Sequence, residues 1–314
     1  MADLSASAQG NARLGPLPLD NGATLPECLI GFRTFGTLND SKANVLVFPS
    51  WYGGRTDSMV DYELVGSGCL ADSDNFFVIA IDSLANGISS SPSQMSGENF
   101  PAVTIRDMVR AQHLLLTKHF ELDHVHAILG VSMSGMHAYQ WSASYPDFAS
   151  NIIAIIGTPK PCAADLYLWQ FWRELANEAL QLPDGERRAL ELLAVAEDLF
   201  SFTPEFINAV SEDGSPDARL AEVIADMSAS NARDRIAQLG AMLSHDAGIK
   251  PDDVKARFLT IVSENDRTVH PGAAAAFAEA ANSPLLWLRS DWGHFAILDE
   301  IDIATEAVRN FLQN

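Results

Sequence analysis

The stretch Gly130-Val131-Ser132-Met133-Ser134-Gly135-Met136 decides how this chain folds. A short apolar run, Val125 to Leu129, precedes it, and a helix-like run through Trp141 follows it. A strand, a tight turn of small residues and a helix place a serine on a strained elbow with its hydroxyl exposed. Small neighbours are needed because such a turn crowds the backbone. Ser132 is therefore a candidate nucleophile; the alternative is an ordinary strand-to-helix turn rich in glycine and serine.

Apolar runs alternate with helical patterns on both sides of this elbow, which is typical of a mostly parallel sheet in an α/β fold. We expect strands at residues 28–35, 44–49, 76–81, 125–129, 152–156, 257–262 and 285–288. Amphipathic spacing predicts helices over 103–120 and 304–312. Residues 1–20 look like a loose lead-in.

The strand pattern is interrupted from about residue 158 to about residue 250, where the sequence reads as several helices. We predict an α/β core in two parts, residues 1–157 and 251–314, and a helical lid insert at residues 158–250. Such an insert would cover the carboxyl ends of the strands, shape a substrate pocket and exclude water.

The chain of 314 residues carries 20 Lys and Arg against 41 Asp and Glu, a formal net charge of -21. Such an acidic surface repels phosphates and anionic lipids. We therefore expect a small-molecule partner rather than nucleic acid or a membrane. Cys28, Cys69 and Cys162 are scattered, which suits a reducing compartment. The segment from Met1 to Ala6 lacks the regions of a signal peptide, so a cytoplasmic location is expected. Neither a metal-ligand cluster nor G-x-G-x-x-G stands out, so we expect no metal and no cofactor.

A serine hydroxyl needs a base within hydrogen-bond reach to act as a nucleophile. His294 is the one histidine of eight that lies just beyond a predicted strand, follows a glycine and comes late enough in the chain. We assign the others to helices, strand starts or loops, with a place in the pocket left open for His137: His113, His119, His124, His126, His137, His245 and His270.

The base in turn needs an orienting acid. Asp266 lies just beyond the strand predicted at 257–262 and precedes His294, which gives the chain order serine, acid, histidine found in α/β-hydrolases. Glu264 and Asp291 are the alternatives, and both could equally be exposed loop carboxylates.

Acyl chemistry also needs two N–H groups aimed at the developing oxyanion. One belongs to the residue after the nucleophile, Met133. The other comes from the loop Pro49-Ser50-Trp51-Tyr52-Gly53-Gly54, whose glycines permit close approach of the backbone. We predict the amide of Trp51, with Ser50 or Tyr52 as the neighbouring alternatives.

Three motifs resemble the homoserine O-acetyltransferase branch of the α/β-hydrolase superfamily. Residues 35–39, F-G-T-L-N, are similar to that family's Y-G-T-L-N, and residues 100–112, F-P-A-V-T-I-R-D-M-V-R-A-Q, to its F-P-x-V-T-I-R-D-x-V-x-x-Q. Residues 132–136, S-M-S-G-M, resemble its S-M-G-G-M. The resemblance implies the α/β-hydrolase fold and the nucleophile, acid and base named above. It also implies a homodimer that pairs through the helical insert.

The chain departs from that branch at positions that bear on the reaction. Phe295 stands where true homoserine acetyltransferases carry the aspartate of G-H-D, which helps to hold the amino group of homoserine. Ser134 replaces a glycine of the elbow, and the loop at residues 48–53 differs from C-H-A-L-T-G. The insert does not resemble the transferase lid and is more similar to hydrolase members of the branch.

Five residues are the candidates for substrate binding. Ser50 and Tyr52 lie in the early loop, Phe295 follows the base, and Trp169 lies in the insert. Arg233, also in the insert with Arg235 nearby, could hold a carboxylate. Aromatic packing and surface ion pairs are the alternative explanations for these side chains.

We expect a serine hydrolase that cleaves a small ester or amide through an acyl-enzyme. Acyl transfer from acetyl-CoA to an alcohol is the alternative and would use the same catalytic residues. A third hypothesis is a silent binding protein that uses the pocket for a ligand. Phe295 favours hydrolysis, because it cannot pair with an ammonium group.

Overall fold

A computed structural model describes residues 8–95, 100–211 and 215–313 of the protein. In this part of the chain an eight-stranded sheet has the order β1-β4-β8-β5-β9-β10-β11-β12. β4 runs antiparallel to both of its neighbours, and the later strands pair in parallel, so the predicted mostly parallel sheet is confirmed. The bounds in sheet order are Gln9–Arg13, Leu29–Phe35, Phe77–Ile81, Val45–Pro49, Val125–Val131, Ala149–Ile155, Arg257–Ser263 and Leu285–Leu288.

The prediction of a loose lead-in at residues 1–20 was wrong for the part that the structure describes. β1 pairs antiparallel with β4, from Gln9 opposite Arg33 to Arg13 opposite Leu29. β2 (Leu17–Pro18) pairs with β3 (Thr24–Leu25) in a small separate hairpin. The sequence of β1, Q-G-N-A-R, is polar because it forms the edge of the sheet, so it lacks the apolar run of a buried strand.

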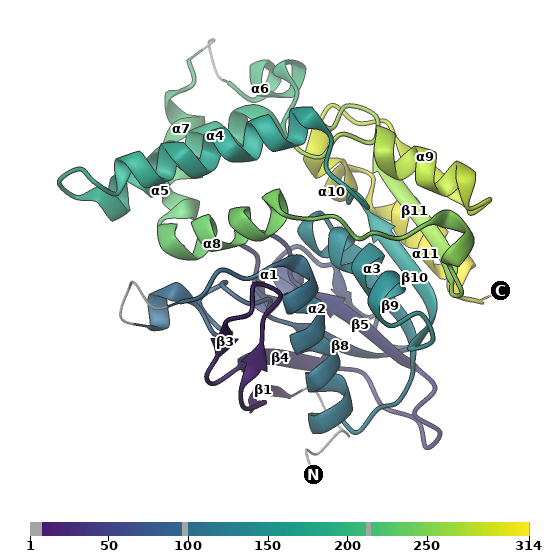
Figure 1. The fold of residues 1–314 in the computed structure, drawn as a ribbon. Helices are drawn as coiled ribbons and strands as arrows, with labels where there is room; N and C mark the ends of the chain where they lie inside the picture. Colours follow the sequence, from purple (N-terminus) through teal and green to yellow (C-terminus); the bar gives the residue numbers. More distant parts are fainter. Residues whose placement is uncertain (1–7, 96–99, 212–214, 314) are drawn as a thin grey trace.

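Two apolar layers cover the two faces of the sheet, because successive strand residues point to opposite sides. In β5, Val45 and Val47 face one layer, whereas Leu46 and Phe48 face the other. On the first face lie α2 (Ile105–Leu114), α3 (Met133–Ser144) and α9 (Gly272–Ala280), and on the second lie α1 (Thr56–Asp61), α10 (Ala296–Asp299) and α11 (Ile301–Gln313) (Figure 1). All residues of β5 are buried, which explains its continuous apolar sequence.

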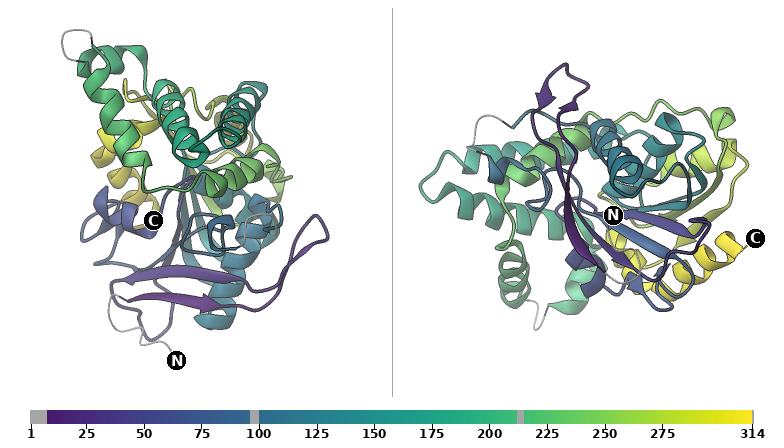
Figure 2. Two further views of the ribbon diagram at one scale, coloured as in Figure 1. Left: turned by 90° about the vertical axis from the view of Figure 1, so that its left-hand side faces the viewer. Right: turned by 90° about the horizontal axis from the view of Figure 1, so that it is seen from below.

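Helices fill the described part of the segment between β10 and β11, and no strand occurs there. They are α4 (Ala163–Ala179), α5 (Gly185–Ser201), α6 (Pro204–Val210), α7 (Asp217–Met227) and α8 (Ala232–Leu243). Figure 2 (left) shows this helical insert stacked over one end of the sheet, on the side away from β1. The last core residue in a strand before the insert is Ile155, and the first after it is Arg257.

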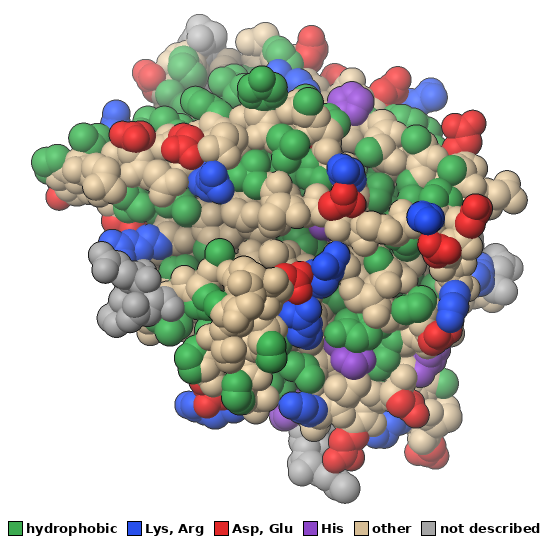
Figure 3. Space-filling model, viewed as in Figure 1, with side chains coloured by type: hydrophobic (Ala, Val, Ile, Leu, Met, Phe, Trp, Pro, Cys, Tyr) green, Lys and Arg blue, Asp and Glu red, His purple; other side chains and the backbone are tan. Residues whose placement is uncertain are grey.

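The surface mixes acidic, basic and apolar side chains on the face seen in Figure 3. Among the described residues, none of the helices combines the length and apolar character that crossing a bilayer requires. The segment from Met1 to Ala6, on which the expectation about a signal peptide rests, lies outside the described residues.

Candidate active site

The turn between β9 and α3 holds Ser132 in a backbone conformation that residues other than glycine rarely adopt, with φ 57° and ψ -121°. Such a conformation costs about 1–3 kcal/mol and persists only where the surroundings enforce it. The two flanking glycines are part of that enforcement. A Cβ on Gly130 would collide with the carbonyl oxygen of Ser134, and one on Gly135 would lie 2.8 Å from the carbonyl oxygen of Ile155.

Ser134, the departure from the usual elbow pattern, strengthens the turn. Its hydroxyl donates to the carbonyl oxygen of Val131 at 2.9 Å and accepts from the Val131 amide at 2.8 Å. The side chain is fully buried, so these bonds are shielded from water. A serine at this position therefore stabilises the turn through two hydrogen bonds to the Val131 backbone.

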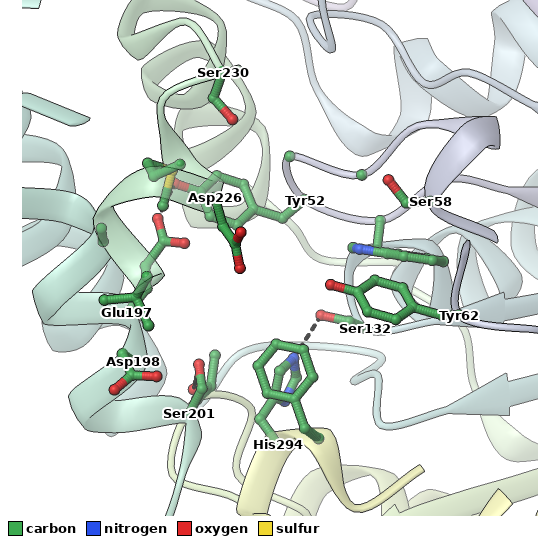
Figure 4. Close-up of a pocket in the computed structure, with 18 of the residues that line it drawn as sticks. Tyr52, Ser58, Tyr62, Ser132, Glu197, Asp198, Ser201, Asp226, Ser230 and His294 are labelled. Carbon is green, nitrogen blue, oxygen red and sulfur yellow. Dashed lines mark hydrogen bonds between the residues drawn. The ribbon is translucent and has the colours of Figure 1, made fainter. Parts of the chain in front are cut away.

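Ser132, His294 and Asp266, predicted from their places at strand ends, lie in one hydrogen-bonded row. The Ser132 Oγ lies 2.8 Å from His294 Nε2 (Figure 4). On the other side of the ring, His294 Nδ1 lies 2.7 Å from Asp266 Oδ2. The other carboxylate oxygen of Asp266 accepts from the amides of Thr268 at 2.8 Å and Val269 at 2.9 Å. Asp266 is thereby fixed, and its side chain is fully buried. The row lets the hydroxyl donate to Nε2 while the Nδ1–H donates to the carboxylate.

The alternative acids and bases lie elsewhere. Glu264 is paired with Arg289 at 3.5 Å, and Asp291 is exposed and accepts from Thr203 through its backbone carbonyl. His137 is fully buried against Gln112, 3.0 Å away, and does not line the pocket. Burial lowers its pKa to about 3.

The two predicted oxyanion donors have free amides. Met133 is the first residue of α3, where backbone N–H groups have no partner within the helix and attract negative charge. Neither the Met133 amide nor the Trp51 amide has a hydrogen-bond acceptor among the described residues. Ser50, by contrast, is fully buried and bound to Ser83 through its hydroxyl, 3.0 Å, and its carbonyl, 2.7 Å. The Ser50 amide donates to Ile81 at 2.8 Å, so the alternative donor at Ser50 is excluded.

A cavity of about 660 Å³ opens above Ser132 and His294. The core contributes an aromatic wall from Trp51, Tyr62 and Phe295. The insert contributes polar and charged side chains from α5 and α7 that face Ser132 across the cavity (Figure 4): Glu197, Asp198, Ser201 and Asp226. The site therefore has one aromatic side and one side of polar and charged groups.

Of the five residues predicted to bind substrate, Tyr52 and Phe295 line this cavity, and Ser50, Trp169 and Arg233 do not. Trp169 is fully buried in the core, and its indole N–H donates to the carbonyl of Thr268 at 3.1 Å. Arg233 is exposed, because it lies on a face of α8 away from the cavity. The structure therefore gives none of these three side chains a place in the cavity wall.

Sequence reasoning also missed residues that do face the cavity. Tyr62, next to α1, and Asp226, in α7, line it, and burial together with the nearby Asp226 raises the pKa of Tyr62. Phe202 of the insert stacks on Phe295, with ring centroids 4.9 Å apart. None of them carries a local sequence signal, because only the packing of the insert brings them to the site.

The arginines that line the cavity already have acceptors. Arg235 binds both carboxylate oxygens of Glu197 at 2.8 and 3.1 Å, and Arg219 binds Asp198 at 2.5 Å. Arg55 donates to two backbone carbonyls at 3.2 and 3.4 Å. A substrate carboxylate would have to displace one of these partners.

Comparison with known proteins shows which fold family the chain resembles. A family model described as alpha/beta hydrolase fold matches residues 44–301. An ethyl acetate hydrolase of Pseudomonas veronii is 32% identical over 204 residues, 62% of this chain and 58% of that protein. A homoserine O-acetyltransferase of Geotalea uraniireducens is 32% identical over 171 residues, 48% of this chain and 46% of that protein.

Among solved structures, the acetyl esterase MekB superposes with a TM-score of 0.89 at 26% identity, covering 98% of this chain and 97% of that one. The alignments with the two curated relatives span about half of each relative's length. The relatives thus include both esterases and homoserine O-acetyltransferases, as the resemblance predicts.

Proposed function

The chain belongs to the α/β-hydrolase family, and from that premise we propose that it is a serine esterase for small carboxylic esters. The observation that carries the proposal is the hydrogen-bonded row of Ser132, His294 and Asp266 beside two free amides. The name of its relative from Pseudomonas veronii, an ethyl acetate hydrolase, supports a small ester as the substrate.

In the proposed reaction the Ser132 Oγ attacks the ester carbonyl carbon while His294 Nε2 takes the hydroxyl proton. The carbonyl oxygen becomes an oxyanion held by the amides of Met133 and Trp51. Collapse breaks the ester C–O bond, and His294 returns the proton to the leaving alcohol. A water molecule, deprotonated by His294, then attacks the acyl-enzyme and releases the carboxylic acid and free Ser132.

The residue after the base favours water over an amino-acid acceptor. Phe295 offers no charge to an ammonium group, and Arg219 and Arg235 are occupied by carboxylates. Five carboxylates line the cavity against three arginines, so the net charge of its lining disfavours the phosphates of a coenzyme A donor. Acyl transfer is therefore the second candidate.

The two candidates are separated by their products. We expect the purified protein to release p-nitrophenol from p-nitrophenyl acetate with multiple turnovers, and Ser132→Ala to lose this activity. With acetyl-CoA and homoserine together, we expect free thiol to form no faster than without homoserine. Formation of O-acetylhomoserine at a rate above that of ester hydrolysis would replace this proposal with acyl transfer.

We also propose that two copies of the chain associate through the insert. The outer face of α4 exposes apolar side chains, with Tyr167 81% and Phe171 50% exposed. Light scattering should give the mass of a dimer for the wild type and of a single chain for Phe171→Glu. A wild type with the mass of one chain would contradict the dimer.

A cytoplasmic location and the absence of nucleic-acid or membrane partners stay predictions. The thiols of Cys28, Cys69 and Cys162 are all free, as a reducing compartment would keep them.

A further inference from the structure

The loop after β5, residues 50–54, is tied to the core at both ends. The Ser50 carbonyl accepts from the Ser83 hydroxyl at 2.7 Å, and the Gly54 carbonyl accepts from the side-chain amide of Asn86 at 3.1 Å. Inside the loop, the Gly54 amide donates to the Trp51 carbonyl at 3.0 Å. These bonds fix the ends of the loop and leave the peptide between Tyr52 and Gly53 to be held by something else.

That peptide is held by the helical insert. The side-chain oxygen of Gln238, in α8, accepts from the Gly53 amide at 2.7 Å, and its side-chain nitrogen donates to the carbonyl of Leu84 at 3.1 Å. Gln238 is fully buried, so water cannot replace these bonds. One side chain of the insert thus joins the loop to the segment that follows β8.

The insert closes on the same loop at a second point. The Tyr52 hydroxyl donates to Glu197 of α5 at 2.8 Å, and the guanidinium of Arg235 lies 4.9 Å from the centre of the Tyr52 ring. A Cβ on Gly53 would collide with that guanidinium, so any other residue would require Arg235 to move. Gly53 also has φ 66°, a conformation that glycine adopts without strain.

We propose that Gln238 is a positioning residue for the oxyanion hole: it holds the Tyr52–Gly53 peptide and so keeps in place the turn at residues 51–53, which begins with the Trp51 amide. The inference rests on the proposed esterase function. Ser83 holds the Ser50 carbonyl, which shares one planar peptide group with the Trp51 amide. Loss of the Gln238 bond would therefore act by letting the turn at residues 51–53 shift, which moves the Trp51 amide away from the oxyanion. In this account the insert takes part in catalysis through α8, as well as covering the cavity.

The test compares Gln238→Met with Gln238→Glu and the wild type. Methionine has a similar length but cannot accept from the Gly53 amide, whereas glutamate keeps an acceptor oxygen. Removing one oxyanion donor in other serine hydrolases costs about 100- to 1000-fold in kcat, so a misplaced donor should cost about 10- to 100-fold. We expect that loss in Gln238→Met with KM within about twofold, and a smaller loss in Gln238→Glu.

Two further measurements distinguish a positioning role of Gln238 from a role in stability alone. The affinity for butylboronic acid, which forms a tetrahedral adduct on the serine, should fall in Gln238→Met by the same factor as kcat. Asp234→Asn is the matched control, because Asp234 anchors the same helix to Ser93 at 2.8 and 2.6 Å without touching the loop. It should lower the melting temperature but leave kcat within about threefold.

If Gln238→Met does not fold, Gln238→Asn replaces it. Asparagine keeps the amide group but is one methylene shorter, so it does not reach the Gly53 amide. An active wild type with unchanged kcat in the Gln238 variants would overturn the inference alone. Equal losses of kcat in Asp234→Asn and Gln238→Met would also overturn it. A wild type without esterase activity would instead contradict the proposed function.

Discussion

Asp266 serves two sets of partners with its two carboxylate oxygens. One oxygen accepts from His294, and the other accepts from the amides of Thr268 and Val269. In Asp266→Asn the amide oxygen can keep the two backbone bonds, so the loop should hold its shape. The amide nitrogen would then face His294 Nδ1, which would force the tautomer whose Nε2 carries a proton and cannot accept from Ser132.

We therefore expect Asp266→Asn to lower kcat on p-nitrophenyl acetate by about 1,000- to 10,000-fold with little change in melting temperature. Steady-state kinetics and differential scanning calorimetry on the same preparation measure both quantities. A kcat within tenfold of the wild type would mean that Asp266 is not the orienting acid.

The hydroxyl of Ser134 should matter for stability. Ser134→Ala removes both bonds to Val131 and leaves the buried Val131 amide without its acceptor. We expect the free energy of unfolding to fall by about 1–3 kcal/mol in urea denaturation. Ser142→Ala is the matched control, because the Ser142 hydroxyl is buried on the same helix without a hydrogen-bond partner among the described residues. A similar loss in both variants would argue against a specific clamp.

At this scale, the convergence of Ser132, Asp266 and His294 could be predicted because each lies at the end of a recognisable strand. The substrate-binding side chains could not. Trp169 turns into the core and Ser50 turns toward Ser83, and both directions are set by packing between segments far apart in the chain. Gln238 is one polar residue in an amphipathic helix, and nothing in its neighbours marks its contact with Gly53.

Among the elements, the first turn of α4 carries a carboxylate, Asp165, that joins the insert to the loop after β11. Asp165 accepts from the Cys162 amide at 2.9 Å, which caps the helix, and from the His270 amide at 2.9 Å. Asp165→Ala should lose both bonds and lower the free energy of unfolding by about 1–3 kcal/mol. Thermal or urea unfolding measures this loss, and Asp165→Asn, which keeps one acceptor oxygen, should lose less. An unchanged free energy of unfolding in Asp165→Ala would show that the two bonds of Asp165 do not stabilise the folded protein.

The buried strands were predictable as elements because both faces of the sheet are covered, which makes their sequences continuously apolar. β1 was not predictable in this way, because an edge strand is recognised by its partner, β4, rather than by its own composition. The predicted helix at residues 103–120 forms as α2 and then continues as a π-helical turn at Leu115–His119. Periodicity alone does not distinguish these two helix types.

The molecule as a whole contains two buried histidines that bear on its stability in acid. Burial lowers the pKa of His137 to about 3 and that of His245 to about 4, from an ordinary value of 6.5. Between those values and pH 6.5 the unfolded chain binds protons that the folded protein does not. Stability contributed by the neutral histidines is therefore complete above pH 6.5 and is lost as the pH falls through that window.

We expect His245→Gln to reduce this dependence. The free energy of unfolding of the wild type should fall more steeply from pH 6.5 to pH 4 than that of the variant, by up to about 1.4 kcal/mol per pH unit. Urea denaturation at half-unit pH intervals measures the two slopes. Parallel slopes would mean that His245 is not held neutral in the folded protein.

The central claim is that Ser132 carries the acyl group. The most direct test is to mix the protein with p-nitrophenyl acetate, quench with acid during turnover, digest, and locate the acetyl group by mass spectrometry. We predict one acetyl group on the hydroxyl of Ser132 in the wild type and none in Ser132→Ala. An acetyl group on a different residue, or full turnover by Ser132→Ala, would contradict the account.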